Sequence, residues 1–337
     1  MIRSLCVLFC LVLAACGEDF NFVGDTWRPV SEFRIGDYAG LVKKDGVDFR
    51  ILQFTDTHIN TWYDSPSTLE RTYSLMARAI NATKPELLVL TGDNVGNFFN
   101  PVWSQQLIAF LDSFEIPYAL VMGNHDGDFV QMEDGNLQRR IAELFVRGRY
   151  SLFEKGPENV SGTGNYGVNL FNRRGEVLYS LILLDSHSDY IRRDQVDWYE
   201  WYVRGVEVAA GRAVGSLAFF HIPPPEIKFI HQEMKEQGKK DEAGRSAEEA
   251  FKEPPNVQSW NAGLFSRMRE LGSTSHIFFG HDHLNVLDYE YQGVHFVYGL
   301  KTGYCAYNDP DSVGAVLIVL RGETAGDMRV SVDFWYF

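Results

Sequence analysis

The chain has 337 residues, of which 45% are apolar, so it can bury a large core as one sizeable domain or as two smaller ones. Its formal net charge of −14 excludes a role as a nucleic-acid scaffold, because phosphate backbones repel an acidic surface. The charge does not define the chemistry of a pocket, since bound cations can invert the local field.

The N-terminal stretch MIRSLCVLFCLVLAAC, residues 1–16, has the pattern of an export signal. One cation, Arg3, precedes an apolar run from Leu5 to Ala15 that is too short to span a bilayer comfortably. The run ends in LAAC, which resembles the bacterial lipobox, where cleavage precedes a cysteine that then carries lipid. We therefore predict a lipoprotein signal peptide at 1–16 and a lipid anchor to the membrane through Cys16. The alternative is an ordinary signal peptide that happens to contain cysteine.

The predicted location is that of an exported bacterial lipoprotein. Gly17 follows the cysteine where an Asp would retain a lipoprotein in the inner membrane, so the outer membrane or the periplasmic face is favoured. Of the four cysteines, only Cys305 lies outside the signal and the anchor, so the folded body has no internal disulfide. Its stability must therefore come from the core.

Residues 17–44 are mixed and polar, and we predict a tether and entry segment there, followed by a single domain at 45–337. In the first half of this domain, strand-like and helix-like runs alternate. The strands are expected at 48–56, 85–93 and 117–126, and the helices at about 67–81, 102–114 and 137–146. The alternation predicts a parallel sheet with helices packed on it.

The second half of the domain is richer in strands. Strand-like runs cover 165–171, 175–185, 216–225, 275–283, 294–300, 314–321 and 328–337, with a helix at 193–204. The charged segment at 235–255 is predicted to be a surface insertion or mobile loop. The expected fold is α/β: a four-layer α/β/β/α sandwich of two mixed sheets flanked by helices.

Five of the strand-like runs end in clusters of polar side chains. Ligand sites in parallel α/β sheets gather at the carboxyl ends of strands, so these clusters can converge on one point. A glycine precedes three of the clusters and permits close approach of the backbone. The clusters are FTDTH with Asp56 and His58, LTGDN with Asp93, MGNHD with Asn124 and His125, FFHIP with His221, and FGHDH with His281 and His283.

The residue types in these clusters predict a metal site at the C-terminal ends of strands. Imidazole, carboxylate and amide groups without a thiolate suit Zn, Mn or Fe better than a soft metal. The pairs Asp56/His58 and His281/His283 each have a spacing of two residues, which puts both side chains on one side of an extended strand. A single Asp between two such groups can bridge ions about 3.5–4 Å apart.

The clusters resemble the motif series of the calcineurin-like metallophosphoesterase superfamily. That series, D-x-H, G-D-x, G-N-H-[DE], H and G-H-x-H, is complete and in order between Asp56 and His283, and the resemblance spans about 49–300. The sequence that flanks the motifs resembles that of the branch that includes purple-acid-phosphatase-29-like and Dcr2-like proteins. Coloured purple acid phosphatases carry a Tyr where this chain has Gly96, so no tyrosinate–iron colour is expected.

The resemblance implies a role for each motif residue. Asp56, His58 and His283 would hold one metal ion, Asn124, His221 and His281 would hold the other, and Asp93 would bridge both. His125 would face the substrate as the catalytic residue. The implied cofactors are two divalent or trivalent metal ions per chain, with Mn, Fe or Zn favoured.

The implied function is a metal-dependent phosphoesterase that hydrolyses mono- or diesters of a small phosphate-ester substrate. A metal-bridging hydroxide would attack phosphorus, and His125 would assist the leaving group. A pyrophosphate or a cyclic nucleotide would present the same phosphoryl oxygens. The alternative from another class is a lipid-anchored, catalytically silent binding or scaffold protein that retains the fold.

Each motif residue also has an ordinary structural explanation when it is taken alone. Asp56 or Asp93 would serve as a helix cap, His221 as a packed histidine and Asn124 as a turn residue. An accidental origin for the whole set is far less probable than for any one of its members. Asp126 and Asp282 are expected to orient a neighbouring histidine or turn.

Overall fold

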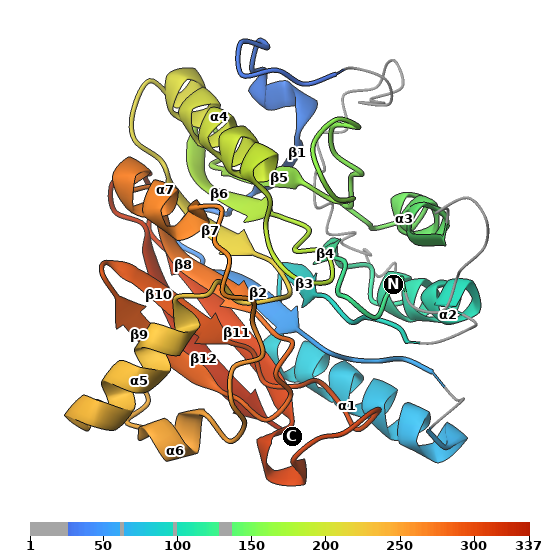
Figure 1. Cartoon of the computed structure of the whole chain (residues 1–337). Helices are drawn as coiled ribbons and strands as arrows, with labels where there is room; N and C mark the ends of the chain where they lie inside the picture. The colour runs from blue at the N-terminus through green and yellow to red at the C-terminus, as the bar shows by residue number, and fades with distance from the viewer. Residues whose placement is uncertain (1–25, 61–63, 97–99, 128–136) are drawn as a thin grey trace, which may run out of the picture.

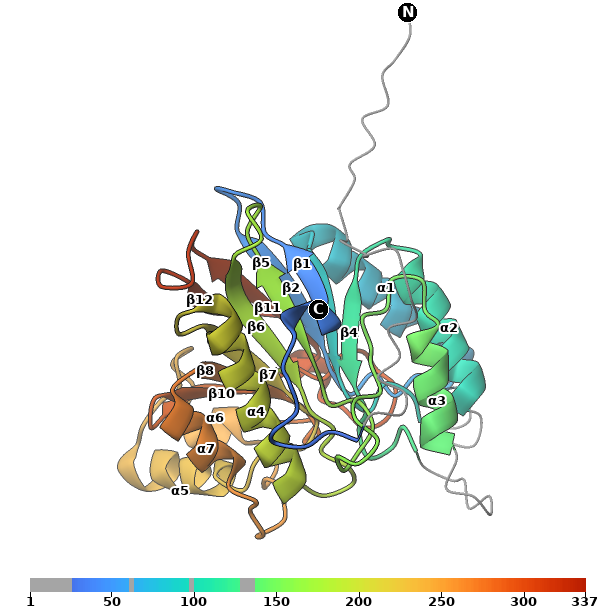
Figure 2. The same ribbon diagram turned by 90° about the horizontal axis from the view of Figure 1, so that it is seen from above.

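The computed structural model describes residues 26–60, 64–96, 100–127 and 137–337. Two mixed sheets pack face to face, with helices on both outer sides (Figures 1 and 2). Helices α1, α2 and α3 lie on one side, and α4 and α7 lie on the other. The expected four-layer α/β/β/α sandwich is confirmed. The signal peptide predicted at 1–16 lies outside the described residues.

The smaller sheet has the order β12-β11-β2-β3-β4. Three of its strands, β2, β3 and β4, run parallel to one another, as the alternation of strands and helices predicts. Strands β11 and β12 extend the sheet in antiparallel pairing. Every residue of β3 and β4 is buried, in agreement with their continuous apolar sequences. The elements are β2 (Phe49–Phe54), α1 (Pro66–Thr83), β3 (Leu87–Thr91), α2 (Asn100–Asp112), β4 (Tyr118–Val121), α3 (Leu137–Val146), β11 (Gly314–Arg321) and β12 (Arg329–Tyr336).

The larger sheet has the order β1-β5-β6-β7-β8-β10-β9. Strands β6, β7, β8 and β10 are parallel, whereas β5 and β9 are antiparallel to their partners β6 and β10. The elements are β1 (Ala39–Val42), β5 (Tyr166–Phe171), β6 (Val177–Leu183), α4 (Arg193–Ala210), β7 (Gly215–Phe219), α5 (Ile227–Gln237), α6 (Ala247–Ala250), α7 (Leu264–Leu271), β8 (Thr274–Phe279), β9 (Leu287–Tyr291) and β10 (Val294–Tyr298). Two 3₁₀ turns cover Ile35–Asp37 and Pro310–Ser312.

The larger sheet separates two apolar cores, and alternate residues of its strands enter each one. Leu217 and Phe219 of β7 belong to the core shared with the smaller sheet, whereas Ala218 and Phe220 belong to the core under α4. This alternation follows from the period-two geometry of a strand. Packing on both faces therefore holds the ends of β7 and its neighbours in register with the ends of β2, β3 and β4.

The structure differs from the sequence-based expectation in several segments, among them α7 and β9, which the sequence pattern did not predict. Residues 26–44, the described part of the predicted tether and entry segment, are integrated into the fold, because Trp27 is buried and β1 pairs in parallel with β5. A four-residue strand in a polar context has too weak a pattern to be recognised from sequence. The charged segment at 235–255 includes the end of α5 and all of α6, and Ala247, Ala250 and Phe251 are buried in the core under α4.

Among the described helices, none combines the length and apolar character needed to cross a membrane.

Truncation of a side chain between the sheets tests this packing. Leu217→Ala is expected to lower the free energy of unfolding by about 2–5 kcal/mol, because Leu217 is fully buried and leaves a cavity. Denaturant unfolding measures the change. Val208→Ala on α4 is the control, since Val208 is 83% exposed and its loss should alter stability by no more than about 0.5 kcal/mol. Equal effects of the two changes would contradict the assigned core.

Candidate metal centre

The predicted ligands lie where strands of both sheets end. Asp56 and His58 follow β2, Asp93 follows β3, and Asn124 follows β4. His221 follows β7, and His281 and His283 follow β8. The face-to-face packing of the sheets brings these five segments to one point.

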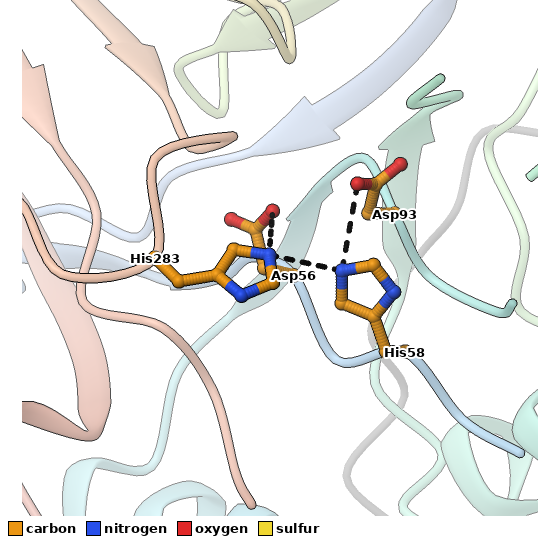
Figure 3. A group of neighbouring side chains, drawn as sticks. All are labelled: Asp56, His58, Asp93 and His283. Carbon is orange, nitrogen blue, oxygen red and sulfur yellow. Dashed lines mark hydrogen bonds and ion pairs between the residues drawn. The ribbon is translucent and has the colours of Figure 1, made fainter. Parts of the chain in front are cut away.

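Asp56, His58, Asp93 and His283 form a buried group in which the side chains point toward one another (Figure 3). The Nε2 atoms of His58 and His283 are 3.0 Å apart. Nε2 of His58 is 3.5 Å from Oδ2 of Asp93, and Nε2 of His283 is 3.4 Å from Oδ1 of Asp56. Two imidazole nitrogens and two carboxylates that converge in this way fit a divalent cation of the Zn, Mn or Fe kind.

A second group adjoins the first and shares Asp93 with it. Nε2 of His221 is 3.2 Å from Oδ2 of Asp93 and 3.1 Å from Oδ1 of Asn124. Oδ1 of Asn124 is also 3.1 Å from Nδ1 of His281. The same Asp93 oxygen therefore faces a histidine nitrogen of each group, which is the arrangement needed for a carboxylate that bridges two ions.

Three of the histidines are oriented by backbone carbonyls. Nδ1–H of His221 donates to the carbonyl of Thr91 over 2.9 Å, and Nδ1–H of His283 donates to that of Tyr307 over 2.8 Å. His281 is turned the other way, and its Nε2–H donates to the carbonyl of Asn256 over 3.0 Å. Because a carbonyl can only accept, each bond fixes the tautomer of the neutral ring and leaves the other ring nitrogen available to a cation.

The backbone at the site differs from the extended strand that the sequence spacing suggests. Asp56 (φ 54°), His58 (φ 44°), Asp93 (φ 48°) and His281 (φ 79°) all adopt left-handed conformations, which non-glycine residues rarely do. The explanation of the Asp56/His58 and His281/His283 pairs by strand alternation is therefore wrong. Both pairs lie in turns beyond the strands, and His281 and His283 accordingly serve different groups.

Glycines allow the turns to pack closely, as expected from their places in the motifs. A Cβ on Gly92 would lie 2.6 Å from the His221 side chain, and one on Gly123 would lie 2.2 Å from the backbone nitrogen of Asp93. A Cβ on Gly280 would lie 2.2 Å from a carboxylate oxygen of Asp56. Any larger residue at these positions would displace a predicted ligand.

The protonation states of the group suit cation binding. Burial raises the pKa values of Asp56 and Asp93, but neighbouring histidines more than offset this effect and hold both pKa values below their usual range. Burial lowers the pKa of His58 to about 3 and that of His281 to about 4. Burial also opposes the charge on His221, but Asp93 outweighs it and raises this pKa to about 10. Without a cation, the His221 proton therefore offsets the buried carboxylates.

His125 lies on the open side of the centre. Its backbone N–H donates to Oδ1 of Asp93 over 2.8 Å, and its side chain is exposed. The ring centroids of His125 and His58 are 5.4 Å apart. The exposed ring of His125 thus lies next to that of His58, one of the predicted ligands.

The two acidic residues expected to orient their neighbours contact the turns. The Asp126 carboxylate accepts from the backbone N–H groups of Val95 and Gly123 and so ties together the turns after β3 and β4. Asp282 accepts from the Tyr298 hydroxyl over 2.5 Å and from the backbone N–H of Asn256, the residue that orients His281.

The sequence did not indicate Lys301, which contacts the backbone of Asp56 in the first group. Lys301 is only 1% exposed, and its Nζ donates to the backbone carbonyl of Asp56 over 2.5 Å. Burial lowers its pKa to about 8, although the Asp56 carboxylate opposes this shift. An isolated Lys in the run YGLKTG has no motif that marks it. Its one signal is that it follows a strand, β10, paired with β8.

A model of the calcineurin-like phosphoesterase family matches residues 49–285, and the chain belongs to this family. The Arabidopsis thaliana proteins named probable inactive purple acid phosphatases 14 and 29 are 27% and 26% identical to it. Those two alignments cover 82% and 77% of this chain, and 76% and 73% of the relatives. The Saccharomyces cerevisiae phosphatase DCR2 is 28% identical, over 79% of this chain and 48% of its own length. These matches confirm the predicted branch, which includes purple-acid-phosphatase-29-like and Dcr2-like proteins.

A crystal structure of a dimetal phosphatase from Danio rerio shares the fold. Its TM-score is 0.53 at 11% sequence identity, with 85% of this chain and 99% of that chain covered.

Replacement of the shared carboxylate tests the two-ion arrangement. Asp93→Asn keeps the side-chain shape but removes the charge that faces both groups, so both ions are expected to be lost or weakly held. His281→Ala should remove only the ion of the second group and leave about one ion per chain. Elemental analysis after dialysis against Mn²⁺ measures the content. His231→Ala on α5 serves as the control, and full metal content in Asp93→Asn would contradict the shared role.

Proposed function

We propose that this protein is a metal-dependent phosphoesterase that hydrolyses phosphate mono- or diesters at a centre of two ions. The observation that carries the proposal is the position of Asp93, whose Oδ2 lies 3.5 Å from Nε2 of His58 and 3.2 Å from Nε2 of His221. Each of these nitrogens belongs to a separate group of nitrogen and oxygen donors. One carboxylate oxygen between two donor groups is the arrangement of a dinuclear centre.

The residues present would hold the two ions as follows. Asp56, His58 and His283 provide the donors on one side of Asp93, and Asn124, His221 and His281 provide those on the other. Two bound ions would supply an activated water near neutral pH and offset the charge that builds up at phosphorus. Nitrogen and oxygen donors without a thiolate favour Mn, Fe or Zn.

His125 is proposed as the residue that assists the leaving group. Its backbone N–H is held by Asp93, while its ring extends to the exposed side near His58. A substrate phosphoryl group enters from that side, so the imidazole can give a proton to the departing oxygen or stabilise its charge. Its role therefore differs from that of the buried histidines.

The alternative is a catalytically silent binding protein, and the names of two relatives include the word inactive. Loss of a predicted ligand would favour this alternative. In this chain all seven predicted ligands and His125 are present, and the seven lie in two adjoining groups. This completeness supports a hydrolase.

The lipid anchor at Cys16 remains part of the proposal, as do export and attachment to the outer membrane or the periplasmic face. Cys16→Ser should release the protein from the membrane fraction of a bacterial host, because the lipobox then has no thiol to carry lipid. Fractionation followed by immunoblotting measures the distribution. The control is Cys305→Ser, which leaves the lipobox unchanged. Membrane association of Cys16→Ser equal to that of the unmodified chain would count against lipidation.

Activity is tested with protein that lacks residues 1–16 and has been stripped with chelator. Hydrolysis of an aryl phosphomonoester and an aryl phosphodiester is followed with Mn, Fe or Zn added back. Restored turnover is expected, and Asn124→Ala and His125→Ala should each lower kcat at least about 100-fold. Metal content distinguishes the two variants, because only Asn124→Ala should reduce it. Two bound ions with no turnover of any ester would favour the silent binding protein.

A further inference from the structure

An exposed aromatic ring lies against one of the predicted ligands. The ring of Tyr307 stacks on that of His283, with centroids 4.1 Å apart and planes inclined by 21°. One face of the tyrosine is thus covered, yet the residue remains 54% exposed. The opposite face of the ring is therefore open to solvent beside the metal centre.

Tyr307 is held firmly in this position. Its carbonyl accepts from Nδ1–H of His283, and its hydroxyl lies 3.3 Å from a carboxylate oxygen of Glu253. The turn before it is also hydrogen bonded, because Asn308 donates to the Ala306 carbonyl over 3.0 Å and Asp64 accepts from the Ala306 N–H over 3.2 Å. A ring that is already ordered loses little conformational entropy when it stacks on a ligand.

The Tyr307 ring lies beside the first group of predicted ligands. Nε2 of His283 faces His58 and Asp56, and Tyr307 stacks on a face of the same imidazole. The organic part of an ester whose phosphate is held by this group would extend past the exposed edge of the centre, the rim, near Tyr307. The Glu253 carboxylate beside Tyr307 repels a second phosphate, so this part of the rim favours an uncharged group.

We infer that Tyr307 is a stacking platform that selects the substrate. The favoured esters carry a flat aromatic ring, either a nucleobase or an aryl group, on the alcohol side of the phosphate. This inference rests on the proposed function. Aromatic faces stack on any flat π system, and the contact is sequence-tolerant among bases.

The test compares three monoesters: adenosine 5′-phosphate, phenyl phosphate and glycerol 3-phosphate, or their methyl esters if the chain acts on diesters. Tyr307→Leu should raise KM for the two ring-bearing esters about tenfold and leave the glycerol ester unchanged. Tyr307→Phe keeps the ring and should behave like the unmodified chain. Tyr336→Leu is the matched control, because Tyr336 on β12 is 47% exposed and its hydroxyl accepts from Arg245.

Binding of the same esters is measured by calorimetry on Mn²⁺-loaded protein that carries His125→Ala. This measurement does not depend on turnover, so a failure of the proposed function is distinguishable from a failure of the inference. Selective loss of ring-bearing esters in Tyr307→Leu supports the platform, and loss of the adenosine ester alone identifies a nucleoside. Equal weakening of all three esters, with or without loss of Mn²⁺, would show a structural role and overturn the inference.

Discussion

Two buried carboxylates set the main constraint on this structure. Asp56 and Asp93 are each 1% exposed and remain ionised, and a buried charge is tolerated only when it is matched by an opposite charge and hydrogen bonded. Without a cation, His221 and Lys301 provide the nearby positive charge. Ring nitrogens of His58 and His283 lie only 3.0 Å apart and point into the same space, where a cation would satisfy both nitrogens and carboxylates. The site is thus built around positive charge, although the chain as a whole is acidic.

The fold maintains this arrangement by joining two sheets. The predicted ligands that follow β2, β3 and β4 come from one sheet, and those that follow β7 and β8 come from the other, so neither sheet alone brings them together. The turns that present them adopt left-handed conformations at Asp56, His58 and Asp93, which cost energy and persist because the surrounding contacts over-determine them. Lys301 provides one of these contacts, since its Nζ donates a hydrogen bond to the Asp56 carbonyl. The stability of the sandwich and the geometry of the site are therefore linked.

The rim of the centre contains different side chains from the two groups of predicted ligands. Those groups consist of carboxylate, imidazole and amide side chains that any phosphoryl group would meet, so they do not distinguish one phosphate ester from another. Tyr307 and Glu253 lie outside the predicted ligands, and we infer that Tyr307 distinguishes esters by their organic part. Two relatives that are 26–27% identical to this chain have names that include the words probable inactive, so the family by itself does not define the activity of this chain.

The sequence by itself determined most of the strands, the helices between the first parallel strands, the two-sheet fold and the set of polar residues at the strand ends. These follow from local signals: continuous apolar runs, helical periodicity, and glycines beside Asp, Asn and His. Only the tertiary structure decided which nitrogen of each histidine faces the centre, that the Asp93 oxygen is shared, and that Lys301 and Tyr307 adjoin the site. The local sequence pattern also did not predict strand β1 or the left-handed turns. The physical reason is that these features depend on contacts between segments far apart in the chain, as between Asp56 and Lys301, and such contacts leave no periodic signal.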